Sequence, residues 1–471
     1  MNITSLSNYH LNNYKLEQQN KQENTSEKNT EYNQNKKYIS YPANYYISFG
    51  NSFNDNLIEQ MKNTKDIQKR IELFRKMTPK AQENCDQLVQ RFKKEGLSFE
   101  NYLSACVKVP SLFYQSPITL ERNVRNLVKN FKNEKLDIKN YLKTCLKVPS
   151  LFCQSPNTIE NNVRNLVKKF ENDGLNSKDY LKACIKQPPL FCLSPDTIEN
   201  NVRNLIKKFE NDGLNTEDYL NACVKSPSLF CQSPNTIEKN IHNFVEKFEN
   251  DGLNTEDYLN ACVKQPSLFY QSPDTIESNV RNLVKKFENY GLNTEDYLNA
   301  CIKKPQLFCQ SPNTIENNVR NLVKKFENDG LKPKDYLKAC TKQPQLFYQS
   351  PDTIAEHINI MKFSNMNLKV PLENKNFWEK ILKNPVMFSL SSLNLLVQSL
   401  IIPKMFENTA IPKELKGKYS LVPKLRTYLE NNPDKTFELN VKGADKDIEI
   451  LKKCINELCN GKSNPFTINR K

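Results

Sequence analysis

The stretch ACVKQPSLFYQSPDTIESNVRNLVKKFE, residues 261–288, decides the fold, because nearly the same string occurs seven times in the chain. The clearest marker is a tyrosine that recurs every 39 residues without an insertion: Tyr102, Tyr141, Tyr180, Tyr219, Tyr258, Tyr297 and Tyr336. A cysteine four residues after each tyrosine and a proline eight residues after it keep the same step. A fixed period of this length is the sequence signature of a repeat architecture.

Within one copy, the first half predicts a short helix that a proline ends. Asn254 or the threonine after it is a favoured residue for a helix start, and the acidic residues that follow suit the first turn. Pro266 stops this helix, because the residue before a proline is pushed out of the α-helical conformation. Leu268 and Phe269 are then expected to enter the core from a short turn.

The second half of the copy predicts a longer helix. It begins at Ser272-Pro273, since serine is a favoured cap and proline is pre-set for the first helical position. Its apolar residues form one stripe: Ile276, Val280, Leu283, Val284 and Phe287. Gly291 is expected to end it in the left-handed conformation. Two such helices cannot bury their apolar faces alone, so the sequence predicts an all-α solenoid, a superhelical array of two-helix repeats.

The repeat register divides the chain into five segments. We predict a disordered polar and aromatic tail at 1–58, because that segment is rich in Asn, Gln, Lys and Glu without a period. A degenerate capping repeat follows at 59–100, seven regular repeats at 101–366 and a degenerate repeat at 367–406. The segment 407–471 is predicted to be a small α+β cap, with a strand at 436–442 and a helix at 445–459.

The net charge of +15 favours a polyanionic partner, but its distribution is uneven. Residues 101–373 contain 36 basic and 31 acidic side chains, a net charge of +5, and their middle copies are acidic. The segments 60–100 and 374–471 carry net charges of +4 and +7. A groove that binds a long duplex is expected to be basic throughout. The charge therefore keeps a protein partner open as an alternative to nucleic acid.

The remaining composition predicts a protein without cofactor, metal or membrane span. Eleven of the 14 cysteines occupy two fixed positions of the repeat, no CxxC pair occurs, and there are only three histidines. A zinc site is therefore not expected, and the thiols are expected to be reduced. The most apolar run, 389–403, is too short for a transmembrane helix. With no recognisable signal or transit peptide, we expect a cytoplasmic protein.

The repeat resembles that of the mitochondrial transcription termination factor family over roughly residues 60–406. The matching pattern combines a fixed proline with spaced apolar residues and a closing glycine: Pro266, Leu268, Phe269, Ile276, Val280, Leu283 and Gly291. The period of 39 is longer than is usual in that family, and phenylalanine replaces the second leucine of its motif. The resemblance implies a helical solenoid that binds nucleic acid along a basic groove.

Basic side chains recur at three positions of the repeat. We call the first the arginine row, which consists of Arg125, Arg164, Arg203, Arg281 and Arg320. The helix-face lysines lie four residues further on: Lys168, Lys207, Lys285 and Lys324. The inter-helix lysines end the short helices: Lys108, Lys147, Lys186, Lys225, Lys264, Lys303 and Lys342.

Stacking of the repeats is expected to align the side chains of each set in a row, and such a row of cations can contact successive phosphates of a nucleic acid. The alternative for the arginine row is a solvated helix face, on which Glu277 precedes Arg281 at the spacing of a surface ion pair. The alternative for the inter-helix lysines is local attraction to the helix C-terminus.

These patterns favour a non-enzymatic recognition protein that binds DNA or RNA through the repeated arginines and lysines. A protein–protein interaction scaffold is the alternative, because the middle repeats are acidic and the residues around the repeat proline vary. An enzyme with a catalytic C-terminal segment is a third hypothesis. The sequence contains no nucleophile–base set, P-loop or dinucleotide fingerprint in support of it.

Overall fold

A computed structural model of the chain describes residues 52–417 and 420–471. The chain divides into two units, Met1–Asn56 and Leu57–Lys471, and the array lies in the second. Helix α2 (Ser52–Lys62) spans the predicted boundary at residue 58, and the rest of the predicted tail lies outside the described residues.

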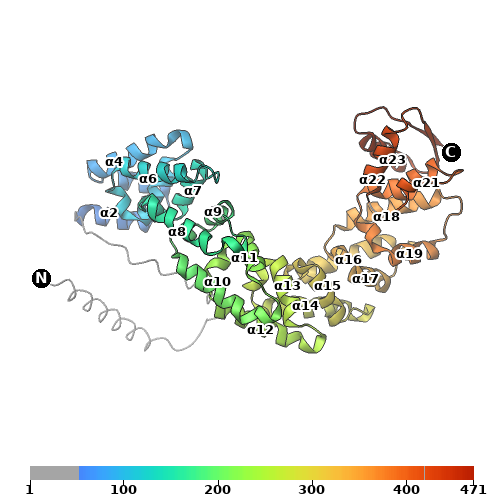
Figure 1. The fold of residues 1–471 in the computed structure, drawn as a ribbon, viewed down its shortest axis with the longest axis horizontal. Coiled ribbons are helices and arrows are strands. Elements are labelled where there is room, and N and C mark those ends of the chain that lie inside the picture. Colours follow the sequence, from blue (N-terminus) through green and yellow to red (C-terminus); the bar gives the residue numbers. More distant parts are fainter. Residues whose placement is uncertain (1–51, 418–419) are drawn as a thin grey trace. The chain divides into compact units, whose positions relative to one another are not determined.

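Each regular repeat consists of a short helix, a 3₁₀ turn and a longer helix (Figure 1). The short helices are α5 (Phe99–Lys108), α7 (Ile138–Lys147), α9 (Ser177–Lys186), α11 (Thr216–Lys225), α13 (Thr255–Lys264), α15 (Thr294–Lys303) and α17 (Pro333–Lys342). The long helices are α6 (Pro117–Asn130), α8 (Pro156–Lys169), α10 (Pro195–Phe209), α12 (Pro234–Phe248), α14 (Pro273–Phe287), α16 (Pro312–Phe326) and α18 (Pro351–Met366). Upstream of them lie α3 (Ile67–Phe74) and α4 (Pro79–Arg91).

The helix boundaries fall where the local residues predicted them. In the copy around α13, the Asn254 side chain accepts a hydrogen bond of 2.8 Å from the Asp257 amide, and a 3₁₀ turn begins at Pro266. After α14, Gly291 adopts the left-handed conformation with φ of 83°. Ser272 stands at the N-cap of α14, but its side chain makes no capping bond, and its backbone carbonyl accepts from the Ile276 amide instead.

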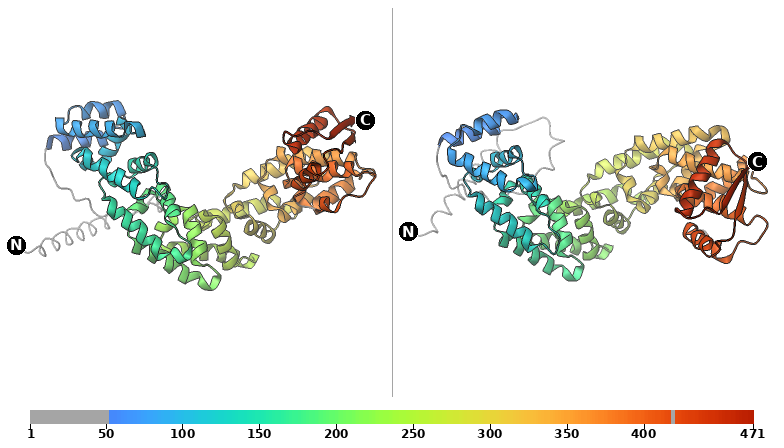
Figure 2. Two further views of the ribbon diagram at one scale, coloured as in Figure 1. Left: turned by 45° about the horizontal axis from the view of Figure 1, so that its top comes forward. Right: turned by 90° about the horizontal axis from the view of Figure 1, so that it is seen from above.

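The repeats stack in two layers. Each long helix packs against the next long helix, from α4 through α18, and each short helix packs against the next short one, from α5 through α19 (Asn374–Lys383) (Figure 2). Every repeat thus contacts chiefly its neighbours, which is the defining property of a solenoid. The predicted fold class is confirmed.

Two contacts repeat across the core between neighbouring copies. In α5 through α15, the tyrosine of each short helix meets the phenylalanine of the 3₁₀ turn in the following copy edge to face, as between Tyr219 and Phe269, whose centroids lie 5.4 Å apart. Asparagines of the long helices donate to a carbonyl in the next repeat, for example Asn123 to Phe152 at 3.3 Å. Both contacts join residues of different copies, so they stabilise stacking rather than single repeats.

The C-terminal segment confirms the predicted α+β cap. In the predicted cap, 407–471, lie η16 (Lys413–Leu415), α22 (Leu421–Glu430), β1 (Phe437–Val441), α23 (Asp445–Cys459) and β2 (Phe466–Arg470). The segment before it, 367–406, contains α19, η14 (Pro385–Ser389), α20 (Ser392–Leu396), a π-helical turn η15 (Val397–Ile401) and α21 (Ile402–Met405). The strand and helix expected at 436–442 and 445–459 are present. Strand β2, which pairs with β1 in parallel, was not predicted. The Asn367 side chain exchanges two hydrogen bonds with the backbone of Lys442 and fixes the cap to α18.

Candidate nucleic-acid interface

The arginine row forms on the long-helix layer, and each of its guanidinium groups makes the same three contacts. In α8, Arg164 Nε donates to Glu160 Oε1 at 2.7 Å, and Nη2 donates to the Asn130 carbonyl of the preceding repeat at 3.2 Å. The guanidinium also lies 5.0 Å from the ring centroid of Phe131. Arg125, Arg203, Arg281 and Arg320 repeat this geometry on their own neighbours. Each arginine therefore clamps two consecutive repeats.

Four of the five clamp glutamates also bond to a second basic residue, whereas Glu160 accepts from the Asn130 side-chain amide. Glu199 accepts from Arg203 on its own helix at 2.8 Å and from Lys169 on the preceding long helix at 2.5 Å. Glu277 and Glu316 have the equivalent pairs of partners. Hydrogen bonds from the lysine and the arginine lower the pKa of all three carboxyl groups below the ordinary value. The ion pair expected between Glu277 and Arg281 is thus one part of a network between repeats.

Two copies, α12 and α18, lack this network, and in α18 both the glutamate and the arginine are absent, since Ala355 and Asn359 take their places. In α12 only the arginine is missing. His242 replaces the arginine, and its ring lies 5.4 Å from that of Phe209 at 34°. Glu238 keeps its bond to Lys208, but Glu246 stands where α8, α10, α14 and α16 have a helix-face lysine. The next junction, between α12 and α14, adds Asp274, which pairs with Lys247 at 3.0 Å. The acidity seen in the sequence therefore falls on the middle of the long-helix layer.

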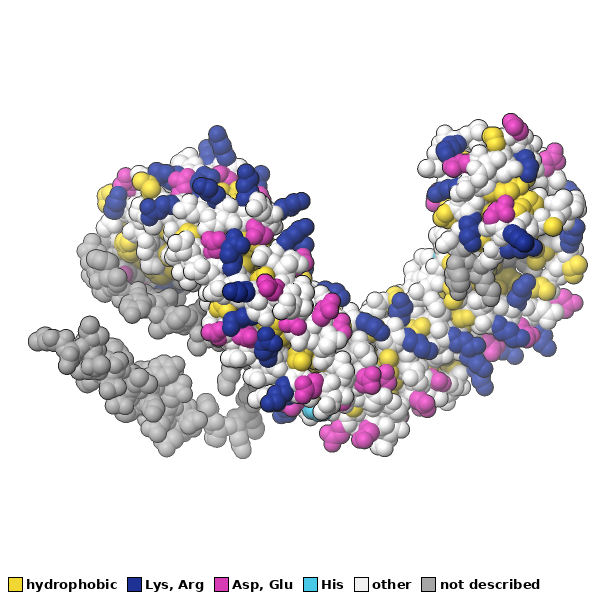
Figure 3. Space-filling model, viewed as in Figure 1, with side chains coloured by type: hydrophobic (Ala, Val, Ile, Leu, Met, Phe, Trp, Pro, Cys, Tyr) yellow, Lys and Arg dark blue, Asp and Glu magenta, His cyan; other side chains and the backbone are white. Residues whose placement is uncertain are grey.

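The helix-face lysines have a different environment from the arginine row. Lys168, Lys207, Lys285 and Lys324 are exposed, and within residues 52–417 and 420–471 none of them has an ion-pair or hydrogen-bond partner. They are four free cations at one position of four repeats. On the face shown in Figure 3, Lys and Arg side chains alternate with Asp and Glu along the array. Free cations in such a mixture are the groups best able to contact a new anion.

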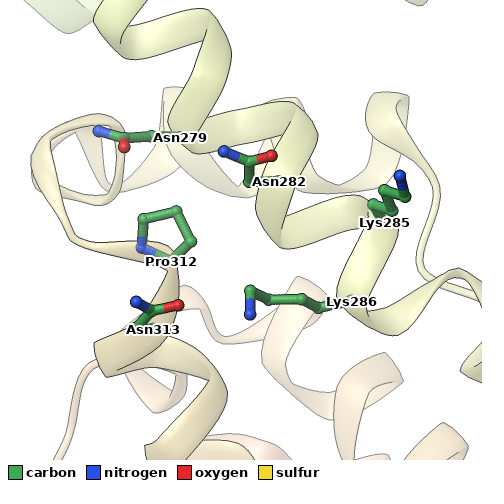
Figure 4. A pocket seen from close by; sticks show the side chains of 6 residues that line it. All are labelled: Asn279, Asn282, Lys285, Lys286, Pro312 and Asn313. Atoms are coloured by element: carbon green, nitrogen blue, oxygen red, sulfur yellow. The ribbon is translucent and has the colours of Figure 1, made fainter.

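A pocket lies beside the helix-face lysine at two junctions. Between α14 and α16 it measures about 520 Å³, and its lining is amide and ammonium groups: Asn279, Asn282, Lys285, Lys286, Pro312 and Asn313. Lys286 extends into it toward Asn313, and Lys285 stands at its rim (Figure 4). The equivalent pocket between α8 and α10, of about 450 Å³, has Asp196 in place of the asparagine. Asp196 pairs with Lys169, so the α14–α16 pocket carries the larger positive charge.

The inter-helix lysines occupy the last turns of the short helices. Lys108, Lys147, Lys186, Lys225, Lys264, Lys303 and Lys342 are all exposed, and the described part of the chain offers none of them an ion-pair partner. This position is also the one at which a helix dipole attracts a cation. They form a second row of free charges, on the short-helix layer.

The cysteines are unsuited to nucleophilic chemistry. All fourteen are free thiols, and those of the short helices are buried. Burial also raises the pKa of the half-exposed thiols Cys153, Cys192 and Cys231 to about 11. A thiol with so high a pKa is almost entirely protonated at neutral pH, whereas the thiolate is the reactive form.

A metal site and a membrane-spanning helix each place requirements on the described residues. No group of three or more His, Cys, Asp or Glu side chains in 52–417 and 420–471 is arranged to hold a metal ion. Within the same ranges, no helix combines the length and the apolar character needed to cross a bilayer.

The fold and this surface define a helical-repeat protein whose copies are joined by clamps of arginine, glutamate and phenylalanine. The model of the mTERF family matches residues 196–329, which run from α10 to the turn after α16. The resemblance inferred from the repeat is thereby confirmed, and this part of the array is similar to the mTERF repeat. No curated protein matches the chain. The mTERF family is known for nucleic-acid-binding repeat proteins that are generally not enzymes and are often organellar.

Sequence reasoning identified the basic rows but missed their partners. Lys169, Lys247 and Lys286, which complete the glutamate bridges, were not singled out. They can be recognised in the sequence by their spacing, because each of these lysines lies 30 residues before a glutamate, and that glutamate lies four residues before an arginine. The asparagines of the pockets follow the same repeat register and were also missed.

Proposed function

We propose that this chain is a non-enzymatic protein that binds nucleic acid along its helical array, in which the free lysines make the phosphate contacts. The observation that carries the proposal is the set of exposed, unpaired helix-face lysines at one repeat position: Lys168, Lys207, Lys285 and Lys324. Stacking brings these charges into register on neighbouring long helices, as a polyphosphate backbone requires.

Within this proposal, the arginine row has a positioning role. Arg125, Arg164, Arg203, Arg281 and Arg320 are between 42% and 51% exposed, but each is already paired with a glutamate and a carbonyl oxygen. A phosphate that took one of these guanidinium groups would have to compete with those bonds. The arginines hold the spacing between repeats and thereby the spacing of the lysines.

The inter-helix lysines are proposed as a second set of contacts on the short-helix layer: Lys108, Lys147, Lys186, Lys264 and Lys303, with Lys225 and Lys342 at the same position. The cytoplasm remains the compartment predicted from the sequence. Full-length chain carrying a fluorescent tag tests that prediction by its location.

Fluorescence anisotropy of labelled single-stranded and duplex DNA and RNA against the full chain, at two salt concentrations, tests the proposed function. We expect saturable binding that weakens steeply with salt, because neutralised phosphates release counterions. Absence of binding to all four probes at low salt would refute nucleic-acid binding. Because the four probes are compared directly, the same titrations identify the preferred nucleic acid.

A protein–protein scaffold is the second candidate, and the α12–α14 junction favours it. There Lys247 is paired with Asp274 and Glu277, Arg281 is paired with Glu277, and Glu246 replaces the helix-face lysine of α12, so α12 offers a phosphate no helix-face cation. An affinity pull-down with and without nuclease separates the two candidates. A partner protein that persists after nuclease treatment, with no nucleic-acid binding in the anisotropy assay, would favour the scaffold.

A further inference from the structure

A cavity of about 350 Å³ lies between the last long helix of the regular array, α18, and the segment that follows it, namely α19, η14 and the π-helical turn η15. Figure 1 shows α18, α19 and α21 close together in this part of the array. The volume falls within the range of ligand pockets, which is about 300–1,000 Å³. None of the basic rows discussed above contributes a residue to it.

Most of the cavity wall is apolar. It includes Leu368, Leu372, Phe377, Ile381 and Met387. Three large hydrophobic side chains beside these lining residues in the sequence are exposed at the surface, namely Met366, Val370 and Val386. A mostly apolar wall favours a ligand with an apolar body.

The polar groups of the wall divide into satisfied and free ones. Ser399 donates to Ser364 at 2.8 Å, and Asn365 exchanges hydrogen bonds with the backbone of Leu372. By contrast, the side chains of Lys380, Asn384 and Gln398 have no hydrogen-bond or ion-pair partner in the described parts of the chain. All three present N–H donors, and Lys380 is the single charged group of the wall.

These three donors come from two elements that hold them at one cavity. Lys380 and Asn384 are four residues apart at the end of α19, so they lie on the same face of that helix. Gln398 belongs to the π-helical turn, in which the Ile402 amide bonds to the Val397 carbonyl five residues earlier. Pro403 follows this turn and has no amide hydrogen to continue the α-helical pattern. Such π-helical turns are frequent at functional sites.

We propose that this cavity binds a small molecule with an apolar chain and a single carboxylate. The chain would lie against the wall of leucine, isoleucine, methionine and phenylalanine. The carboxylate, which only accepts hydrogen bonds, would take those of Lys380, Asn384 and Gln398. One cation matches one negative charge, so a nucleotide or another polyphosphate is a poorer fit. This inference stands independently of nucleic-acid binding.

The test uses the full chain with decanoate and decanol, two probes that share an apolar chain and differ in the charged group. Displacement of a dansylated fatty acid reports the affinity of each. We expect saturable binding of decanoate and a loss of about tenfold on Lys380→Gln, in line with a charge-assisted hydrogen bond. Decanol affinity should stay unchanged in that variant. Lys383→Gln is the matched control, because Lys383 lies on the same helix, pairs with Glu379 and is not part of the wall.

A second variant keeps the test decisive about the location of the site. Gln398→Phe places a large side chain at the half-buried wall of the cavity, and we expect it to abolish binding of both probes while circular dichroism stays unchanged. The proposal is overturned if decanoate fails to displace the dansylated probe from the wild-type chain. Equal decanoate affinity in the Lys380→Gln and wild-type chains, or normal binding by the Gln398→Phe chain, would overturn it too.

Discussion

Replacing His242 by arginine should stabilise the array, because it completes the clamp of α12, in which only the arginine is missing. The five arginines of the row define the geometry to be restored. Their Nε atoms lie 2.7–2.9 Å from the glutamate, and their guanidinium groups lie 4.8–5.4 Å from the phenylalanine ring. In α12 the corresponding partners are already present as Glu238, Phe209 and the Lys208 carbonyl.

The size of the gain follows from these contacts. An exposed pair four residues apart on a helix contributes about 0.3–0.5 kcal/mol, and a cation over an aromatic ring at a partly exposed site about 0.5–1 kcal/mol. A hydrogen bond from a charged donor to a carbonyl adds about 1 kcal/mol or more. The ordering of a long side chain and the loss of the present ring contact offset part of this. We expect a net stabilisation of about 1 kcal/mol.

Amide hydrogen exchange is the suitable assay, because repeat arrays open locally and need not unfold in one step. Protection of the α10, α12 and α14 amides should rise about fivefold in the His242→Arg chain. His242→Lys is the control, since it supplies a charge without the planar fork that contacts both partners. Unchanged or lower protection after His242→Arg, or an equal gain after His242→Lys, would refute the clamp.

Three further predictions follow from the same contacts. Arg281→Gln should lower amide protection in α14 by about 1 kcal/mol, whereas Lys285→Gln, one turn away and unpaired, should leave it unchanged. Equal effects of the two variants would contradict the assignment of the arginines to repeat stacking and of the lysines to phosphate contact. Because the pKa values of Glu199, Glu277 and Glu316 are lowered, these carboxylates stabilise the fold above about pH 4.5, and this stabilisation is lost as the pH falls through the lowered values. In thermal melts, the melting temperature should therefore fall less steeply with acid in the triple Glu→Gln chain than in the wild-type chain. Gly443→Ala should destabilise the C-terminal cap by about 1–3 kcal/mol in urea titrations, because the added Cβ would lie 2.6 Å from Phe363.

The array itself was predictable, because its determinants are local and repeated. The polar cap at most short-helix starts, the proline that stops each short helix and the left-handed glycine after most long helices act within a few residues, and the 39-residue period repeats them along the chain. By contrast, β2 is only five residues long and pairs with a strand more than 20 residues away. The π-helical turn was missed because local sequence preferences rarely distinguish it from an α-helix.

The candidate interface was predictable only in part. Its basic residues stand out in the sequence, but a sequence does not say which of them are already paired. Arg164 and Lys168 are one helical turn apart and look equally available, yet Arg164 is bound to Glu160 and Asn130, and Lys168 is not. The difference arises because Asn130 belongs to the preceding repeat. The contact therefore depends on how the copies stack.

The salt dependence of nucleic-acid binding tests this division of roles most directly. Anisotropy titrations of the preferred probe should compare the wild-type chain with one that carries Lys168→Gln, Lys207→Gln, Lys285→Gln and Lys324→Gln. If the four lysines each contact a phosphate, the slope of log affinity against log salt should fall by about 3 to 4. An unchanged slope in the four-lysine variant, with normal helicity, would contradict the account.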